Sequence, residues 1–107
     1  MKNLTLALKT PQLRWLPKHL QHITENIVFK QRNVSFLAIN AIFRQKTHKI
    51  TASNKEKGNF IIEDYVALQR NDMLRRKAEI LTVIFYLDKH DNIVVVTAYS
   101  ENDTDYS

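Results

Sequence analysis

The spacing of apolar residues changes near residue 47, from about 3.6 residues to two, and this change limits the folds open to the chain. Between residues 20 and 43 the apolar side chains recur at spacings of three and four, as on one face of a helix. Between residues 59 and 100 they alternate or run together as β-branched residues, as in strands. The sequence therefore predicts an α+β fold, with helices first and an antiparallel sheet second.

The 107 residues suit a single domain with one hydrophobic core, since most domains hold about 100–150 residues. Leucines at every second position from Leu4 to Leu8 predict an extended arm or a short strand within residues 1–16. Residues 17–100 are expected to carry the helices and the sheet. The acidic end, residues 101–107, is expected to fray.

Two N-terminal helices are expected, over Pro17–Phe29 and Phe36–Gln45. Pro17 suits a first helical turn, where its missing N–H breaks no hydrogen bond, and Ser35 can cap the second helix through its hydroxyl. The second helix is apolar round most of its circumference. We therefore expect it to be buried between the first helix and the sheet.

Four antiparallel strands are expected to follow, at Thr47–Ser53, Asn59–Leu68, Glu79–Leu87 and Ile93–Ser100. The last two should form a hairpin. Twofold alternation places Thr97 and Tyr99 on the same face as Ile93 and Val95. The predicted architecture is thus two N-terminal helices packed on a four-stranded antiparallel sheet.

Positive charge is concentrated in the first half of the chain. Residues 1–58 hold eleven Lys and Arg against two acidic residues, and residues 59–107 hold five against nine. A positive surface attracts polyanions, because cations that neutralise phosphates release condensed counterions. Nucleic acid is therefore the leading class of partner. Cysteine is absent and no apolar stretch approaches about 20 residues, so disulfides, thiolate metal sites and membrane spans are not expected.

His19 and His22 lie three residues apart on the first predicted helix and so share a face. Histidine suits proton transfer near neutral pH because its ordinary pKa is about 6.5. Solvated surface histidines would show the same pattern. Two histidines supply at most half of a zinc site, and no cysteine or carboxylate cluster completes it, so no metal and no other cofactor is expected.

The order of these features resembles the barnase–EndoU–colicin–RelE group of small metal-independent ribonucleases, which includes bacterial toxin domains. The resemblance covers roughly His19 to Ser100. It rests on His22-Ile23-Thr24, on Gln31-Arg32-Asn33-Val34-Ser35 before the second helix, and on Ile93-Val94-Val95-Val96-Thr97-Ala98-Tyr99-Ser100. Related toxins usually have proline after the Thr-x-Tyr motif, where this chain has Ser100.

The resemblance implies attack of an RNA 2′-hydroxyl on the adjacent phosphate, leaving a 2′,3′-cyclic phosphate. His19 or His22 would transfer protons, Arg32 would clamp the phosphate, and Thr97 and Tyr99 would hydrogen-bond it. Flanking phosphates would be bound by further cations, namely Lys30, Arg44, Lys46 and Lys49.

The resemblance further implies a toxin domain, as in contact-dependent inhibition, that acts in the bacterial cytoplasm on RNA, with tRNA one candidate. The chain would be either a whole protein or the C-terminal part of a secreted toxin, and an acidic immunity protein or antitoxin would neutralise it.

Two other classes of function fit the same charge distribution. A non-catalytic nucleic-acid-binding module would use the basic half of the chain without proton transfer, although the predicted sheet shows no clear pair of exposed aromatic residues for base stacking. An interaction protein would bind an acidic partner through the same surface.

Overall fold

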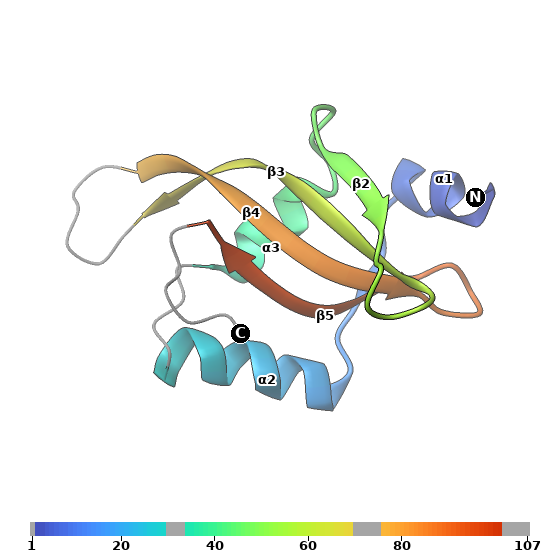
Figure 1. Ribbon diagram of the computed structural model, residues 1–107, viewed down its shortest axis with the longest axis horizontal. Helices are drawn as coiled ribbons and strands as arrows, with labels where there is room; N and C mark the ends of the chain where they lie inside the picture. The colour runs from blue at the N-terminus through green and yellow to red at the C-terminus, as the bar shows by residue number, and fades with distance from the viewer. Residues whose placement is uncertain (1, 30–33, 70–75, 102–107) are drawn as a thin grey trace.

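The computed structural model describes residues 2–29, 34–69 and 76–101, which form three helices and a five-stranded sheet (Figure 1). In chain order the elements are α1 (Lys2–Lys9), β1 (Leu13–Arg14), α2 (Pro17–Phe29), α3 (Phe36–Ile42), β2 (Lys49–Ala52), β3 (Asn59–Gln69), β4 (Arg76–Leu87) and β5 (Ile93–Ser100). The α+β class is confirmed, as is the order of helices before the main sheet.

The sheet has the order β1-β5-β4-β3-β2, and its last four strands are antiparallel as predicted. The expectation of four strands was wrong, because β1 pairs in parallel with the start of β5 through Leu13–Ile93 and Arg14–Val94. A strand of two residues is too short to show an alternating pattern. The sheet is therefore five-stranded and mixed.

The predicted N-terminal arm or strand is instead the helix α1, so the helices number three in the described residues rather than two. Leu4 and Ala7, three residues apart, are buried on one helical face, whereas Leu6 is 57% exposed. Leucines at positions 4, 6 and 8 match a twofold pattern by coincidence, because only Leu4 and Leu8 pack inward. The buried Ala7 supplies the helical spacing.

The first main helix, α2, has the predicted bounds, but α3 ends at Ile42 rather than at Gln45. The hydroxyl of Ser35 accepts the Ala38 backbone N–H at 3.1 Å, which confirms the predicted N-cap. Burial of α3 is less complete than predicted, since Leu37 is 82% exposed.

The strand β5 has the predicted bounds, while β2 is shorter than Thr47–Ser53. The long strands β3 and β4 extend past their predicted ends to Gln69 and from Arg76. The β2–β3 turn contains Gly58 at a φ of 92°, a conformation that glycine adopts without strain.

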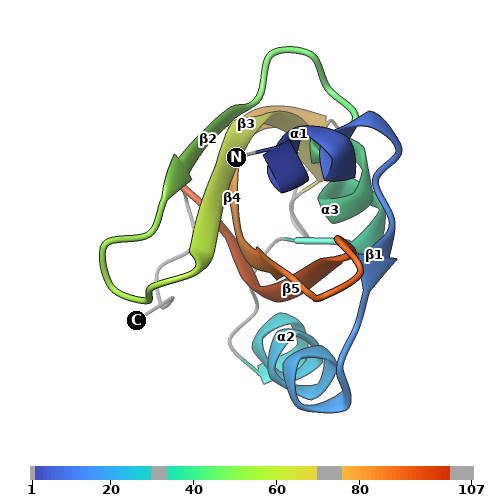
Figure 2. The same cartoon turned by 90° about the vertical axis from the view of Figure 1, so that its right-hand side faces the viewer.

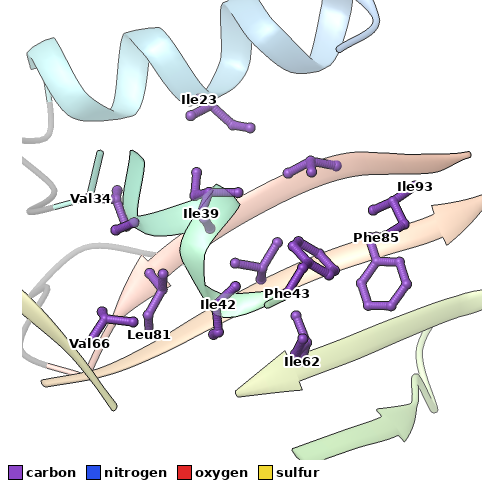
Figure 3. Close-up of a cluster of buried hydrophobic side chains, with 14 of the residues drawn as sticks. Ile23, Val34, Ile39, Ile42, Phe43, Ile62, Val66, Leu81, Phe85 and Ile93 are labelled. Carbon is purple, nitrogen blue, oxygen red and sulfur yellow. The ribbon is translucent and has the colours of Figure 1, made fainter. Parts of the chain in front are cut away.

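The core lies between α3 and the concave face of the curved sheet (Figures 2 and 3). Phe43 meets Phe85 edge to face with ring centroids 5.1 Å apart, and both side chains are at most 1% exposed. Both α1 and α3 cover this concave face, whereas α2 lies beyond β5, on the side away from β3 (Figures 1 and 2). The opposite face of the sheet carries neither α1 nor α3, and α2 packs against the strand β5.

Candidate functional site: the open face of the sheet

A β-bulge in β5 turns the Thr-x-Tyr motif away from the core. Val95 pairs with Phe85 but Thr97 pairs with Ile84, so Val96 is an extra residue in the ladder. Ile93 and Val95 therefore face the core, whereas Thr97 and Tyr99 point to the other side of the sheet. The predicted common face for these four residues was wrong, because simple alternation assumes an unbroken ladder.

We call the side of the sheet opposite α1 and α3 the open face. It carries a row of four side chains that are direct cross-strand neighbours: Lys49 pairs with Glu63, Glu63 with Thr82, and Thr82 with Tyr99. We call these four residues the four-strand row. Neighbouring members have Cβ atoms about 5 Å apart. The row thus brings a cation, a carboxylate, a hydroxyl and a phenol into one line.

The Glu63 carboxylate is held in place within this row. The Thr82 hydroxyl donates to Glu63 Oε2 at 3.4 Å, and Thr82 itself is only 6% exposed. The structure records no ion pair between Lys49 and Glu63, both of which it describes. Both side chains are exposed. The carboxylate and the ammonium can therefore each meet a ligand from solvent.

A hollow of about 190 Å³ adjoins the row, and Lys49, Glu63 and Tyr65 are among its lining residues. Tyr65 is 61% exposed and lies on the same face as Glu63, two residues further along β3. Tyr86 and Tyr99 on this face are partly exposed. The open face therefore presents two aromatic rings, those of Tyr65 and Tyr86, in addition to that of the predicted site residue Tyr99.

Of the two helix histidines, His19 borders the open face. Its ring meets that of Tyr86 edge to face, with centroids 6.3 Å apart, and Tyr86 lies on the open face opposite Val94. Burial lowers the pKa of His19, and the positive charges of Lys18 and His22 lower it further. The imidazole is therefore neutral at pH 7 and can accept a proton.

The other histidine, His22, is exposed and is hydrogen-bonded within its own helix. Its Nε2 lies 3.0 Å from Nδ2 of Asn26, whose side chain is buried. The two imidazoles thus have different partners: His19 contacts Tyr86 of the sheet, and His22 contacts Asn26 on α2.

The predicted phosphate-binding cations do not form one group. Lys49 belongs to the four-strand row, whereas Arg44 and Lys46 line a different hollow together with the end of α1. Both views place α2 at the bottom of the molecule and the α3–β2 connection at the top (Figures 1 and 2). The connection that carries Arg44 and Lys46 therefore lies on the other side of the molecule from α2, the helix that carries His19. Lys30 and Arg32 lie outside the described residues.

Sequence reasoning missed Glu63, Tyr65 and Thr82. The alternation within β3 and β4 could have placed each of them on a known face, but it could not tell which residues of different strands are neighbours. That information lies in the register, which depends on the turns and on the bulge at Val96.

Within the described residues, no three His, Asp or Glu side chains gather as ligands of a metal ion would. None of the helices in these ranges is both long and apolar enough to cross a bilayer. Comparison of the chain with protein-family models, curated proteins and solved structures finds no match.

Proposed function

We propose that this protein is a metal-independent endoribonuclease whose substrate lies across the open face of the sheet. Cleavage proceeds by attack of a 2′-hydroxyl on the adjacent phosphate and leaves a 2′,3′-cyclic phosphate and a free 5′-hydroxyl. The observation that carries this proposal is the four-strand row, which sets the Glu63 carboxylate and the Tyr99 phenol on either side of Thr82.

The spacing in the row suits this reaction. Glu63 and Tyr99 are two strand spacings apart, about 9.5 Å, so a phosphate fits between their side chains above Thr82. Glu63 takes the 2′-proton as the 2′-oxygen bonds to phosphorus, and Tyr99 gives its proton to the departing 5′-oxygen. Lys49, beside Glu63, stabilises the negative charge that develops on the phosphorane.

Residues around the row supply binding rather than proton transfer. The exposed ring of Tyr65 offers a surface on which a base can stack. His19 lies beside Tyr86, which is four residues along β4 from Thr82, or about 13 Å. We therefore assign His19 to a neighbouring nucleotide rather than to the reacting phosphate.

Other parts of the proposal depend on the resemblance to the ribonuclease group alone. They are the phosphate contacts of Arg32 and Lys30, the action of the protein as a toxin in the bacterial cytoplasm, and an acidic immunity protein as its partner. Expression in a bacterium tests the toxin role, since wild-type protein should arrest growth and the Glu63→Gln variant should not.

The test of the reaction is incubation of purified protein with a synthetic RNA in EDTA. We expect fragments with 2′,3′-cyclic phosphate ends from wild-type protein and at least about 100-fold slower cleavage by Tyr99→Phe, which lacks the donated proton. RNA of the same sequence with 2′-O-methyl groups should stay intact. Cleavage of that methylated RNA, or equal rates for wild type and Tyr99→Phe, would contradict the mechanism.

A non-catalytic RNA-binding module is the second candidate, and the 61% exposure of Tyr65 is the observation that favours it. Such a module would bind the synthetic RNA and leave it intact. Its affinity would depend on Tyr65 and Lys49 and would not change in Tyr99→Phe.

A further inference from the structure

A second, larger hollow lies between two parts of the chain. One is the end of α1 with the residues that follow it, and the other is the connection from α3 to β2. Its volume is about 600 Å³, and it is lined by the ends of α1 and α3 and by the segments that follow them. Its basic lining residues are Lys9, Arg44, Lys46 and His48, and we call it the basic hollow.

The charges of the basic hollow are not offset by acidic residues in its lining, since the described residues that line it include no Asp or Glu. The nearby carboxylate of Asp64 is already engaged, because it accepts Gln45 Nε2 at 2.7 Å and the Thr47 hydroxyl at 2.6 Å. Burial raises the pKa of Asp64, but these hydrogen bonds outweigh it and hold the pKa below its ordinary value. The hollow is therefore a positive surface depression suited to an anion.

Two observations indicate that the lining has polar groups available to a ligand. Arg44 uses one N–H of its guanidinium, which donates to the Asn40 carbonyl at 2.9 Å, and its planar group has others. The Nδ1 atom of His48 is buried without a hydrogen-bond partner among the described residues. Buried polar atoms without partners are rare, and a missing water or ligand is one usual explanation.

The segment before β2 connects the basic hollow to the open face. Lys46 and His48 line the basic hollow, whereas Thr47 and Lys49 line the hollow beside the four-strand row. Since β2 is an edge strand of the sheet, the two hollows lie on either side of one edge. A nucleic-acid strand that crosses this edge would meet both.

We infer that the basic hollow binds phosphates of the same RNA strand, away from the phosphate that is cleaved. This inference builds on the proposed function: the reacting nucleotide lies on the open face, and the chain continues round the β2 edge into the basic hollow. Lys9, Arg44 and Lys46 contact its backbone and read no base. The site should therefore increase affinity for long substrates and leave the chemical step unchanged.

The experiment measures binding of uncleavable 2′-O-methyl oligouridylates of 4 and 16 nucleotides by fluorescence anisotropy, from 50 to 300 mM salt. The test variant is Lys9→Gln/Lys46→Gln. The matched control, Lys55→Gln/Lys57→Gln, removes the same charge from the exposed β2–β3 turn. Circular-dichroism melting checks that both variants fold.

For the 16-mer we expect the test variant to bind about tenfold more weakly at 100 mM salt, with a salt slope reduced by about 1.4, or roughly 0.7 for each lost contact. Binding of the 4-mer should stay within about twofold of wild type, as should binding of both oligomers to the control variant. Equal losses for the 4-mer and the 16-mer, equal losses in the control variant, or no binding of the 16-mer by wild type would each overturn the inference.

The outcome is separable from that of the proposed reaction, because methylated RNA reports binding without cleavage. A protein that binds the 16-mer through Lys9 and Lys46 but cleaves no RNA would retain this site and lose the proposed function. If the protein cleaves RNA but Lys9→Gln/Lys46→Gln binds the 16-mer as tightly as wild type does, the proposed function would stand and this site would not.

Discussion

The two faces of β4 contrast sharply, although their residues alternate along one strand. Leu81, Val83 and Phe85 on the core face have no exposed surface, while Thr82 and Tyr86 on the open face are neighbours of polar or charged side chains. The core face joins the sheet to α1 and α3, and the open face holds the four-strand row. Substitutions on the two faces should therefore act on different properties, stability on one and chemistry on the other.

The largest difference in stability is expected for a pair of aromatic residues, one on each face. Phe85→Ala should lower the free energy of unfolding by about 3–5 kcal/mol, because it leaves a cavity against Phe43. Tyr65→Ala, on the open face, should change it by less than about 1 kcal/mol. Urea denaturation measures both, and similar losses would mean that the open face is also part of the core.

The next effect is on activity. Lys49→Gln should slow RNA cleavage about 30-fold, because in the proposed mechanism the charge of Lys49 stabilises the phosphorane. Its melting temperature should stay close to that of wild type, as Lys49 is exposed. Lys55→Gln in the β2–β3 turn removes an equal charge away from the row, and an equal loss of activity there would show a general effect of charge instead.

Ser100 lies on the core side of β5, the strand that carries Thr97 and Tyr99. Its substitution tests how much that side contributes to stability. Ser100 has no exposed surface, and its hydroxyl donates to the fully buried Glu79 at 3.2 Å. Ser100→Ala should cost about 1–3 kcal/mol of stability, since a buried carboxylate loses a donor. Thr51→Ala on the exposed edge strand should cost far less. Chemical denaturation of the two variants gives the comparison.

Substitution of His19 tests whether a residue at the border of the open face contributes less to catalysis than the residues at its centre. His19→Ala should reduce kcat/KM less than tenfold, because the imidazole lies near Tyr86 rather than near Glu63. The pKa of His19 is lowered, so an essential His19 base would make wild-type activity fall as the pH drops through that lowered pKa. We expect the profiles of wild type and His19→Ala to run parallel from pH 5 to 8. A fall confined to wild type would make His19 the catalytic base.

The smallest effect is expected for Asp88 in the β4–β5 turn, at the end of both faces of β4. It is an effect of pH on stability. The Asn92 backbone N–H, with further donors from His90 and Arg14, lowers the pKa of Asp88 to about 2. A carboxyl with a lowered folded-state pKa stabilises the fold above its unfolded value of about 3.9, and this contribution is lost as the pH falls toward 2. Asp88→Asn should therefore melt below wild type at pH 6, and the gap should close by pH 2.

The sequence predicted those elements whose pattern is long and locally determined. The bounds of α2 and β5 and the N-cap at Ser35 follow from a proline, a run of β-branched residues and a serine hydroxyl. The helix α1 and the strand β1 were missed because eight and two residues give too little pattern, and β1 exists only through its partner β5. Pairing with β5 decided β1, and burial of Leu4 and Ala7 in the core decided α1.

The sequence could identify individual candidate residues of the site, but not which of them lie together. Tyr99 was a candidate through the Thr-x-Tyr motif and Lys49 through the basic residues after the second helix, but their common row depends on two intervening strands and on the bulge at Val96. Glu63 looked like any polar residue of a half-exposed strand. The separation of Lys49 from Arg44 and Lys46, close in sequence, likewise arises because the segment before β2 turns alternate side chains to different hollows.

The proposal that the four-strand row is the catalytic centre is tested most directly by the cleavage rate of Glu63→Gln. The substrate is a short RNA with one susceptible linkage, and Glu56→Gln from the β2–β3 turn is measured beside it. The change keeps the size of the side chain and removes its ability to accept a proton. We predict a loss of about 10²–10⁴-fold for Glu63→Gln, an unchanged melting temperature, and wild-type activity for Glu56→Gln. Wild-type cleavage by Glu63→Gln would contradict the assignment of the four-strand row as the catalytic centre.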